Sequence, residues 1–222
     1  MNPNIEALQD GTWVIKNDTH ISKWVKEHGT LACDPALFRI MRKWLTDPHI
    51  QTVWDIGANI GDHTFFYLSL GKQVVSVEPN HLAFECLAHN CPQAILLNNA
   101  ASDETGTLRF TALENVGASR ITGDGNIEVE AIRMDDAPVP PPDFVKIDVE
   151  GFEVFALQGM RQTLSHSLPL VFVEVNKSAL AANGHNVDDI LKILQDAGYN
   201  EFTEYPRGIS WESEQFDILA KP

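Results

Sequence analysis

The decisive stretch reads Val53-Trp54-Asp55-Ile56-Gly57-Ala58-Asn59-Ile60-Gly61, and Val74-Val75-Ser76-Val77-Glu78 follows it along the chain. Each is an apolar run with an acid at its end, and the first breaks into a glycine-containing turn. A helix between the two runs completes a strand, turn, helix and strand. In open α/β sheets, ligands bind beyond the carboxyl ends of the strands, so this stretch predicts a cofactor site.

The same alternation continues along the chain. Two further strands with a short loop between them close the C-terminal end. Strands that alternate with helices imply a parallel sheet with right-handed crossovers, here with one antiparallel strand near its end. The predicted strands span about 52–56, 73–78, 94–99, 144–149, 170–175, 200–205 and 216–220, and the helices about 62–70, 81–90, 152–164 and 187–196.

Two segments depart from this rhythm. Residues 106–111 and 126–132 alternate with period two around Asn115, Gly117, Gly123 and Gly125, which predicts a β-hairpin insertion in place of a helix. Residues 1–50 predict turns and two helices, at 21–28 and 35–45. We therefore expect an N-terminal helical cap over residues 1–50 and a cofactor-binding domain over residues 51–222.

The overall charge narrows the class of partner. Acids outnumber bases 31 to 16, which gives a net charge of -15 and disfavours nucleic acid and anionic membrane surfaces. The chain carries no signal peptide pattern and no apolar run long enough to span a bilayer. The chain is expected to be cytoplasmic.

Three cysteines, Cys33, Cys86 and Cys91, cannot all pair within one chain, which indicates reduced thiols. Cys86 and Cys91 with His81 and His89 offer a metal site as an alternative, but their spacing favours an ordinary surface helix.

The glycine turn excludes two common nucleotide sites. A dinucleotide fingerprint that starts at Gly57 requires glycine at the positions of Asn59 and Asp62. A P-loop requires Gly-Lys-Ser/Thr, whereas Gly61 is followed by Asp62 and His63. The acid directly before the turn, Asp55, would repel a pyrophosphate. It suits S-adenosylmethionine, which carries a sulfonium and an amino group and has no phosphate.

Glu78 adds a second contact for such a cofactor. It lies 21 residues beyond Gly57 at the end of the second strand, where an acid can accept both ribose hydroxyls. Asp55 and Glu78 could each also be a strand-end surface acid.

The sequence resembles class I S-adenosylmethionine-dependent methyltransferases, and within them the FkbM family, over about residues 37–220. The resemblance rests on three blocks: residues 53–61, Val75-Ser76-Val77-Glu78-Pro79-Asn80, and Phe144-Val145-Lys146-Ile147-Asp148-Val149-Glu150-Gly151-Phe152-Glu153. Asn115-Val116-Gly117-Ala118-Ser119 also resembles a Gly/Ser-containing loop of the family.

This resemblance implies a Rossmann-like α/β sandwich with a seven-stranded, mostly parallel sheet whose last strand is antiparallel. It also implies O-methylation of a small-molecule hydroxyl, such as that of a sugar or polyketide. Asp55, Gly57 and Glu78 match cofactor-contacting positions, Asn59 replaces the second glycine of the broader class, and Gly61 completes the turn. Asn99 and Ala100, after the third strand, are the candidates for the adenine pocket.

Methyl transfer to a hydroxyl benefits from a base or a metal near the methyl group. Asp148 ends the fourth strand, next to the expected position of the methyl group, and is a candidate cofactor contact as well as a catalytic candidate. Glu150 follows it and Glu174 ends the neighbouring strand. These carboxylates could be a base with supporting acids or a divalent cation site. Glu150 and Glu174 could instead cap helices or pair with Lys146 or Lys177.

His63 and the N-terminal segment supply further candidates. His63, at the start of the helix after the glycine turn, is a possible proton acceptor or a solvent-facing residue. His20, Trp24 and His28 could belong to a lid over the cofactor. Acceptor contacts are expected from the N-terminal segment and from residues 112–126. A nicotinamide-dependent reductase and a non-catalytic cofactor-binding domain remain the competing functions.

Overall fold

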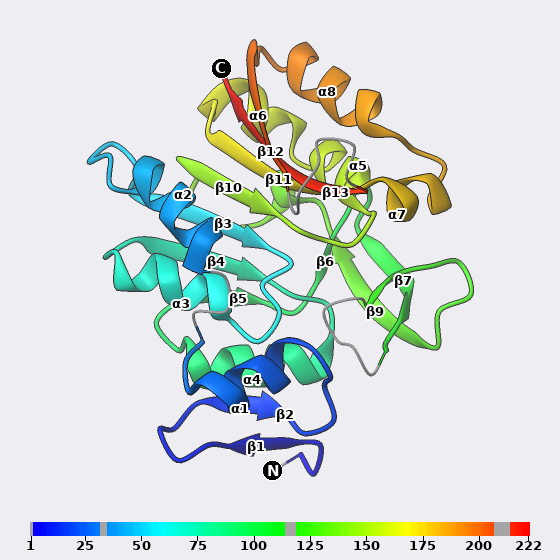
Figure 1. Cartoon of the computed structure of the whole chain (residues 1–222). Coiled ribbons are helices and arrows are strands. Elements are labelled where there is room, and N and C mark those ends of the chain that lie inside the picture. The colour runs from blue at the N-terminus through cyan, green and yellow to red at the C-terminus, as the bar shows by residue number, and fades with distance from the viewer. Residues whose placement is uncertain (1, 32–34, 114–118, 207–213) are drawn as a thin grey trace.

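A computed structural model describes residues 2–31, 35–113, 119–206 and 214–222, and Figure 1 shows its arrangement. Within these residues the central sheet has seven strands in the order β12-β13-β11-β10-β3-β4-β5. β13 runs antiparallel to both of its neighbours, β12 and β11, and the other strands run parallel to one another. This confirms the predicted sheet. The strands are β3 (Thr52–Ile56), β4 (Gln73–Val77), β5 (Ile95–Leu97), β10 (Phe144–Ile147), β11 (Leu170–Asn176), β12 (Glu201–Pro206) and β13 (Gln215–Lys221).

Helices cover both faces of this sheet, because the inner strands are apolar on both faces. On one face, Val53 and Val74 pack with Phe38 of α2 and with Phe66 and Tyr67 of α3. On the other, alternate strand residues such as Trp54 and Ile56 pack with α5, α6 and α8. The helices are α2 (Pro35–Leu45), α3 (Asp62–Ser69), α4 (His81–Asn90), α5 (Glu153–Gln158), α6 (Arg161–Ser167), α7 (Lys177–Ala182) and α8 (Val187–Asp196).

Two details of the second face differ from the expectation. The helix predicted over 152–164 is two helices, α5 and α6, that meet at Gly159 and Met160. A Cβ on Gly159 would lie 1.8 Å from the backbone oxygen of Ser102, so a distant contact sets this break. The sequence reading also missed α7, a six-residue helix whose N-cap is Asn176.

The predicted hairpin insertion is part of a larger sheet. Strands β7 and β9 pair antiparallel as expected, but β6 adds a parallel strand to β9 and β8 adds a strand to β7. This second sheet lies beside the carboxyl ends of the central strands (Figure 1). Asn115 and Gly117 fall outside the described residues. The strands are β6 (Ala100–Ala101), β7 (Gly106–Thr111), β8 (Arg120–Ile121) and β9 (Ile127–Ile132), followed by a 3-10 turn at Met134–Asp136.

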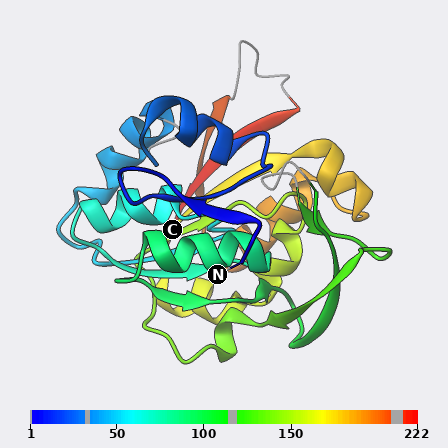
Figure 2. The ribbon, with the colours of Figure 1, turned by 90° about the horizontal axis from the view of Figure 1, so that it is seen from below.

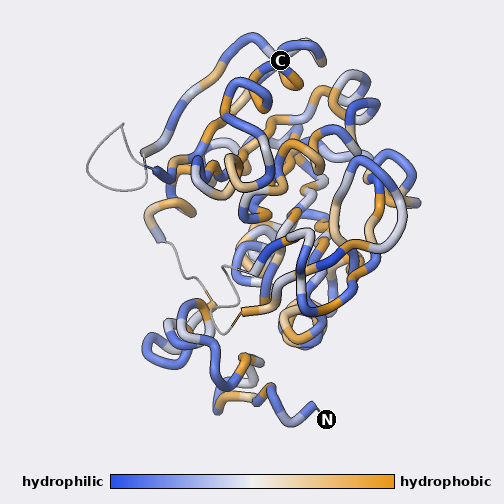
Figure 3. The backbone as a smooth tube through the Cα atoms, turned by 90° about the vertical axis from the view of Figure 1, so that its right-hand side faces the viewer, coloured by the Kyte–Doolittle hydropathy of each residue, from blue (hydrophilic) through white to orange (hydrophobic). Residues whose placement is uncertain are grey.

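The N-terminal segment contains a β-hairpin as well as the two predicted helices. Its strands, β1 (Ile5–Ala7) and β2 (Trp13–Ile15), have three residues each, too few for a visible alternation, and α1 (Ile21–His28) follows. Seen from below, the hairpin lies across α4 (Figure 2). Figure 3 shows hydrophobic residues interspersed with polar ones along this segment.

One side chain ties this hairpin to α4 and to the glycine turn. Asn90, the last residue of α4, accepts a hydrogen bond from the backbone N–H of Trp13 at 2.7 Å. Its amide group donates to the carbonyls of Trp13 and Ile60, at 2.9 and 2.8 Å. The N-terminal segment is thereby fixed relative to the predicted cofactor turn.

Candidate functional site

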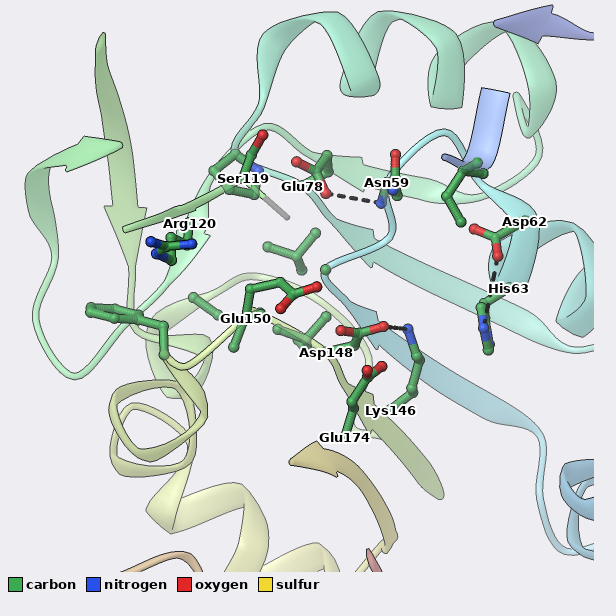
Figure 4. Close-up of a pocket in the computed structure, with 18 of the residues that line it drawn as sticks. Asn59, Asp62, His63, Glu78, Ser119, Arg120, Lys146, Asp148, Glu150 and Glu174 are labelled. Atoms are coloured by element: carbon green, nitrogen blue, oxygen red, sulfur yellow. Dashed lines mark hydrogen bonds and ion pairs between the residues drawn. The ribbon is translucent and has the colours of Figure 1, made fainter. Parts of the chain in front are cut away.

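The candidate site is a pocket of about 450 Å³ at the carboxyl ends of β3, β4 and β10. Residues of α1 and of β8 complete its wall. Its size and its mixture of apolar and convergent polar groups are typical of a small-molecule site. Nine of the residues proposed from the sequence line it: Gly57, Asn59, His63, Glu78, Asn99, Ala100, Asp148, Glu150 and Glu174. Figure 4 shows the side chains of Asp148, Glu150 and Glu174 close together in this pocket.

The turn after β3 requires glycine at its first position. Gly57 has a φ of +85°, and a Cβ there would lie 1.8 Å from the backbone oxygen of Asp148. Its missing side chain therefore lets the turn approach the tip of β10. Asn59 also has a positive φ, 50°, which asparagine tolerates well. Among the described residues, Oδ1 of Asn59 is buried with no hydrogen-bond partner, which leaves an acceptor for a cationic group in this turn.

Asp55 and Gly61 lie beneath the pocket and do not line it. Asp55 is fully buried and faces α3, where the hydroxyl of Thr64 donates to its Oδ2 at 2.6 Å. Burial raises the pKa of Asp55, against the opposing charge of Lys146 and the Thr64 hydrogen bond. A Cβ on Gly61 would lie 3.0 Å from the side chains of Cys91 and Leu87, so this glycine lets the turn pack on α4.

Glu78 is held in the pocket wall by two backbone groups. Its Oε2 accepts from the N–H of Asn59 at 2.9 Å, and its Oε1 accepts from the N–H of Asn80 at 2.7 Å. Burial raises its pKa to about 7, although both hydrogen bonds oppose this. Each carboxylate oxygen has a second lone pair, so this fixed carboxylate can still accept hydroxyl groups from a ligand.

Asp148 forms a hydrogen-bonded ion pair with Lys146, which the sequence suggested as a partner of other acids. Lys146 donates to Oδ2 of Asp148 at 2.8 Å and is itself 2% exposed. The two earlier pairing candidates for Lys146 were Glu150 and Glu174. Burial opposes the charge on Lys146, but the carboxylates of Asp148, Asp55 and Asp62 outweigh it and raise its pKa. A lysine in the otherwise apolar strand β10 is the sequence signal that could have predicted a buried ion pair here.

His63 lies in the pocket wall and is 7% exposed, so it does not face solvent. Its Nε2 is 3.8 Å from Oδ2 of Asp62, its Nδ1 is 3.3 Å from the hydroxyl of Tyr67, and its ring meets Phe38 edge-on. Burial raises the pKa of Asp62 to about 7. Asp62 also lines the pocket but was not predicted as a site residue, and its position as an acid at the start of α3 is the signal that could have marked it.

The loop after β10 positions Glu150. Glu150 and Gly151 both have positive φ, and a Cβ on Gly151 would lie 2.5 Å from the backbone oxygen of Ala179. The N–H of Gly151 donates to Oε1 of Glu153 at 2.9 Å, and Asn183 donates to its carbonyl at 3.0 Å. Burial raises the pKa of Glu153 to about 7. The last acid of the family block therefore supports the loop, while Glu150 lines the pocket.

The remaining walls come from the second sheet and from α1. Ala100 packs with Phe110, Ile121 and Phe152 in an apolar cluster beside Asn99. Ser119 and Arg120, which lie in the range 112–126 from which acceptor contacts were expected but were not singled out there, also line the pocket. Of the proposed lid residues, His20 and Trp24 line it. The ring of His28 stacks on Trp24, with ring centroids 4.2 Å apart.

The described residues contain no group of three or more His, Cys, Asp or Glu side chains placed to hold a metal ion. Cys86 and Cys91 are buried free thiols, and burial raises the pKa of each to about 12. His89 stacks on Trp13, and His81 lies 3.4 Å from Asn98. Cys33 lies outside the described residues. Over the described ranges, no helix is both long and apolar enough to cross a bilayer.

A model of the methyltransferase FkbM domain matches residues 55–201, from Asp55 on β3 to the first residue of β12. The chain belongs to the FkbM methyltransferase family. The resemblance seen in the sequence is therefore confirmed.

A curated relative agrees with this assignment, and a solved structure agrees with the fold. A hexuronic acid methyltransferase, AglP of Haloferax volcanii, is 31% identical over 157 residues, which are 66% of this chain and 62% of that protein. This chain thus spans less than two thirds of its relative's length. A methyltransferase FkbM structure from Methylobacillus flagellatus KT has a TM-score of 0.57 at 16% identity, over 77% of this chain and 43% of that one.

A second solved structure likewise supports the fold. A TehB-like SAM-dependent methyltransferase from Corynebacterium glutamicum has a TM-score of 0.52 at 11% identity and covers 83% of this chain and 85% of its own. The architecture is thus that of class I methyltransferases, as expected.

Proposed function

We propose that this protein is an S-adenosylmethionine-dependent methyltransferase that methylates a hydroxyl group of a sugar or a similar small metabolite. One observation carries the proposal. Glu78, directly after β4, and Asp148, directly after β10, line a single pocket with Gly57 of the turn after β3. The first acid suits a ribose and the second suits a reacting hydroxyl. Family membership supports methyl transfer and does not favour the nicotinamide-dependent reductase.

The residues of the turn fit the cofactor. Glu78 would accept the ribose hydroxyls, and the buried Oδ1 of Asn59 would accept from the amino group. Gly57 lets the turn approach Asp148, so a cofactor held by this turn would lie beside the tip of β10. Asn99 and Ala100 would border the adenine. When bound, S-adenosylmethionine supplies a methyl group whose bond to sulfur breaks as its bond to the acceptor oxygen forms.

Asp148 is the residue to which we assign the acceptor proton. Lys146 holds Oδ2 at 2.8 Å, and Oδ1 is the oxygen we assign to the hydroxyl. The proton passes from the acceptor hydroxyl to this carboxylate, and a methyl ether and S-adenosylhomocysteine leave. Glu150, Glu174 and His63 line the same pocket and are assigned to orient the acceptor. Positioning of this kind contributes much of the rate of a displacement.

The acceptor class draws on the curated relative. Because that protein is named a hexuronic acid methyltransferase, acidic sugars are the first acceptors to test here. Trp24 at the pocket wall gives an aromatic face of the kind on which a sugar ring can stack. Labelled S-adenosylmethionine should be incubated with glucuronate, its glycosides and neutral sugars, and the products separated.

Asp148→Asn tests the catalytic part of the proposal. Loss of a base typically costs about 10²- to 10⁴-fold in rate, and S-adenosylhomocysteine affinity should stay the same. Asp196→Asn, at a surface pair with Lys192, is the matched control and should keep full activity. If wild-type protein binds the cofactor but methylates no acceptor, the chain is a non-catalytic cofactor-binding domain. If Asp148→Asn is fully active, a group other than Asp148 is the base.

A further inference from the structure

Arg120 brings a cation into a pocket that is otherwise rich in acids. It lies on β8, where Arg120 pairs with Thr111 and Ile121 pairs with Phe110. Ile121 is buried in the apolar cluster of the second sheet, and the hydroxyls of Thr111 and Thr122 are 2.5 Å apart. Figure 4 places Arg120 on the side of the pocket away from Asp62 and His63. The second sheet therefore presents this guanidinium from a fixed strand.

Other cations in and near the pocket have partners within the protein. Lys146 donates to Asp148, and Lys23 lies 4.0 Å from Glu27. Arg109, on the same sheet as Arg120 but outside the pocket, pairs with Glu128 at 3.3 Å. Within the described residues, the side chain of Arg120 has no hydrogen bond or ion pair. In a chain with a net charge of -15, such a cation in a pocket wall is suited to bind an anionic group of a ligand.

The proposed cofactor does not readily provide that anion. Its sulfonium and amino groups are cationic, and its one carboxylate belongs to the amino-acid end that the turn and the start of α3 would receive. Asn59 and Asp62, which would receive that end, lie across the pocket from Arg120 (Figure 4). The anion is then expected on the acceptor.

We propose that Arg120 binds the carboxylate of an acidic sugar acceptor and so determines acceptor specificity, an inference that rests on the proposed function. A guanidinium matches a carboxylate with two parallel N–H bonds, which fixes orientation as well as charge. With its carboxylate on β8, the sugar spans the pocket and turns a hydroxyl toward the tip of β10. The second sheet would then recognise the acceptor, while the central sheet provides the cofactor site and the base.

The test measures binding of glucuronate, as a probe, to the protein saturated with S-adenosylhomocysteine. Wild type is compared with Arg120→Gln, Arg120→Lys and the matched control Arg109→Gln. Loss of the charged hydrogen bonds in Arg120→Gln should weaken glucuronate binding by about 10- to 100-fold. The glucuronate affinity of Arg120→Lys should lie between those of wild type and Arg120→Gln, and that of Arg109→Gln should equal that of wild type. Glucose should bind all four proteins with the same, weaker affinity.

Three results would overturn the inference. Equal glucuronate affinity for wild type and Arg120→Gln would remove Arg120 from the acceptor site. Tighter binding of glucose or glucose 6-phosphate than of glucuronate by wild type would exclude a carboxylate as the ligand. A tenfold loss of S-adenosylhomocysteine affinity in Arg120→Gln would assign the residue to the cofactor. Failure of the proposed function is distinct, because it shows as absent cofactor binding or absent methyl transfer in wild type.

Discussion

Nζ of Lys146 donates a hydrogen bond of 2.8 Å to Oδ2 of Asp148, two residues further along the same chain. The lysine comes from the buried strand and the aspartate from its tip. Asp55 pairs in register with Lys146 on the neighbouring strand, and Asp62 also faces this charge. A buried ammonium thus compensates several carboxylates below the pocket, which keeps the acids of the site from repelling one another.

Replacement of Lys146 by methionine should therefore destabilise the protein. Breaking a buried pair by removing one partner costs about 3 kcal/mol or more, because it leaves a buried charge uncompensated. Urea unfolding measures the change. Lys146→Met combined with Asp148→Asn should recover part of the loss, whereas an equal loss in both proteins would mean that the pair is not coupled.

Gly57→Ala should disrupt the site by a steric clash. Its Cβ would lie 1.8 Å from the backbone oxygen of Asp148, and its φ of +85° is unfavourable for alanine. Gly71→Ala is the control, because Gly71 has a φ of +74° but no atom within 4 Å of the added Cβ. The control should lose about 1–2 kcal/mol of stability from strain alone. Gly57→Ala should lose clearly more and no longer bind S-adenosylhomocysteine; equal losses would contradict the close approach.

Glu153 should make stability depend on pH. Burial raises its pKa in the folded protein to about 7, above the ordinary value of 4.5. Because the folded state holds the proton more tightly, this contribution is complete below about pH 4.5 and is lost as the pH rises through about 7. Each unit of pKa difference corresponds to about 1.4 kcal/mol.

Glu153→Gln keeps the acceptor for Gly151 and removes the titration. Between pH 5 and 8, the free energy of unfolding should therefore fall less steeply with rising pH in the variant than in wild type. Glu130→Gln, at an exposed position on β9, should keep the wild-type slope. Parallel curves for Glu153→Gln and wild type would show that Glu153 is charged throughout this range.

Divalent cations should have little effect on the folded protein. Asp148, Glu150 and Glu174 share the pocket, but Asp148 is engaged by Lys146, and no metal-holding group occurs among the described residues. Thermal unfolding and S-adenosylhomocysteine binding should be unchanged by a chelator or by added Mg²⁺ or Mn²⁺. A rise in the melting temperature that saturates with the cation would instead support the cation alternative for these three acids.

The sequence predicted the parts of the fold that local patterns determine. Helices α1, α2, α4 and α8 match their predicted ranges to the residue, because apolar spacing and end signals mark them. The break between α5 and α6 was invisible, since it depends on the contact of Gly159 with Ser102. The strands of the N-terminal hairpin were too short to show a period.

The site residues that follow directly after central strands could be predicted from the sequence. Glu78 and Asp148 follow from the rule that ligands bind at the carboxyl ends of parallel strands. Asp55 obeys the same rule in sequence, yet its side chain faces α3 and Thr64, because alternate strand residues face opposite sides of the sheet. Arg120 reaches the pocket only through the pairing of β8 with β7, which no local pattern specifies.

The affinity of S-adenosylhomocysteine for Glu78→Ala tests the central claim most directly. Glu130→Ala, an exposed acid on β9, is the matched control, and calorimetry at pH 8 gives all three affinities. Loss of hydrogen bonds to a charged group worth about 1.5–3 kcal/mol should weaken binding by at least tenfold in Glu78→Ala and leave Glu130→Ala unchanged. If folded Glu78→Ala binds S-adenosylhomocysteine as tightly as wild type does, the cofactor does not lie in this pocket as proposed.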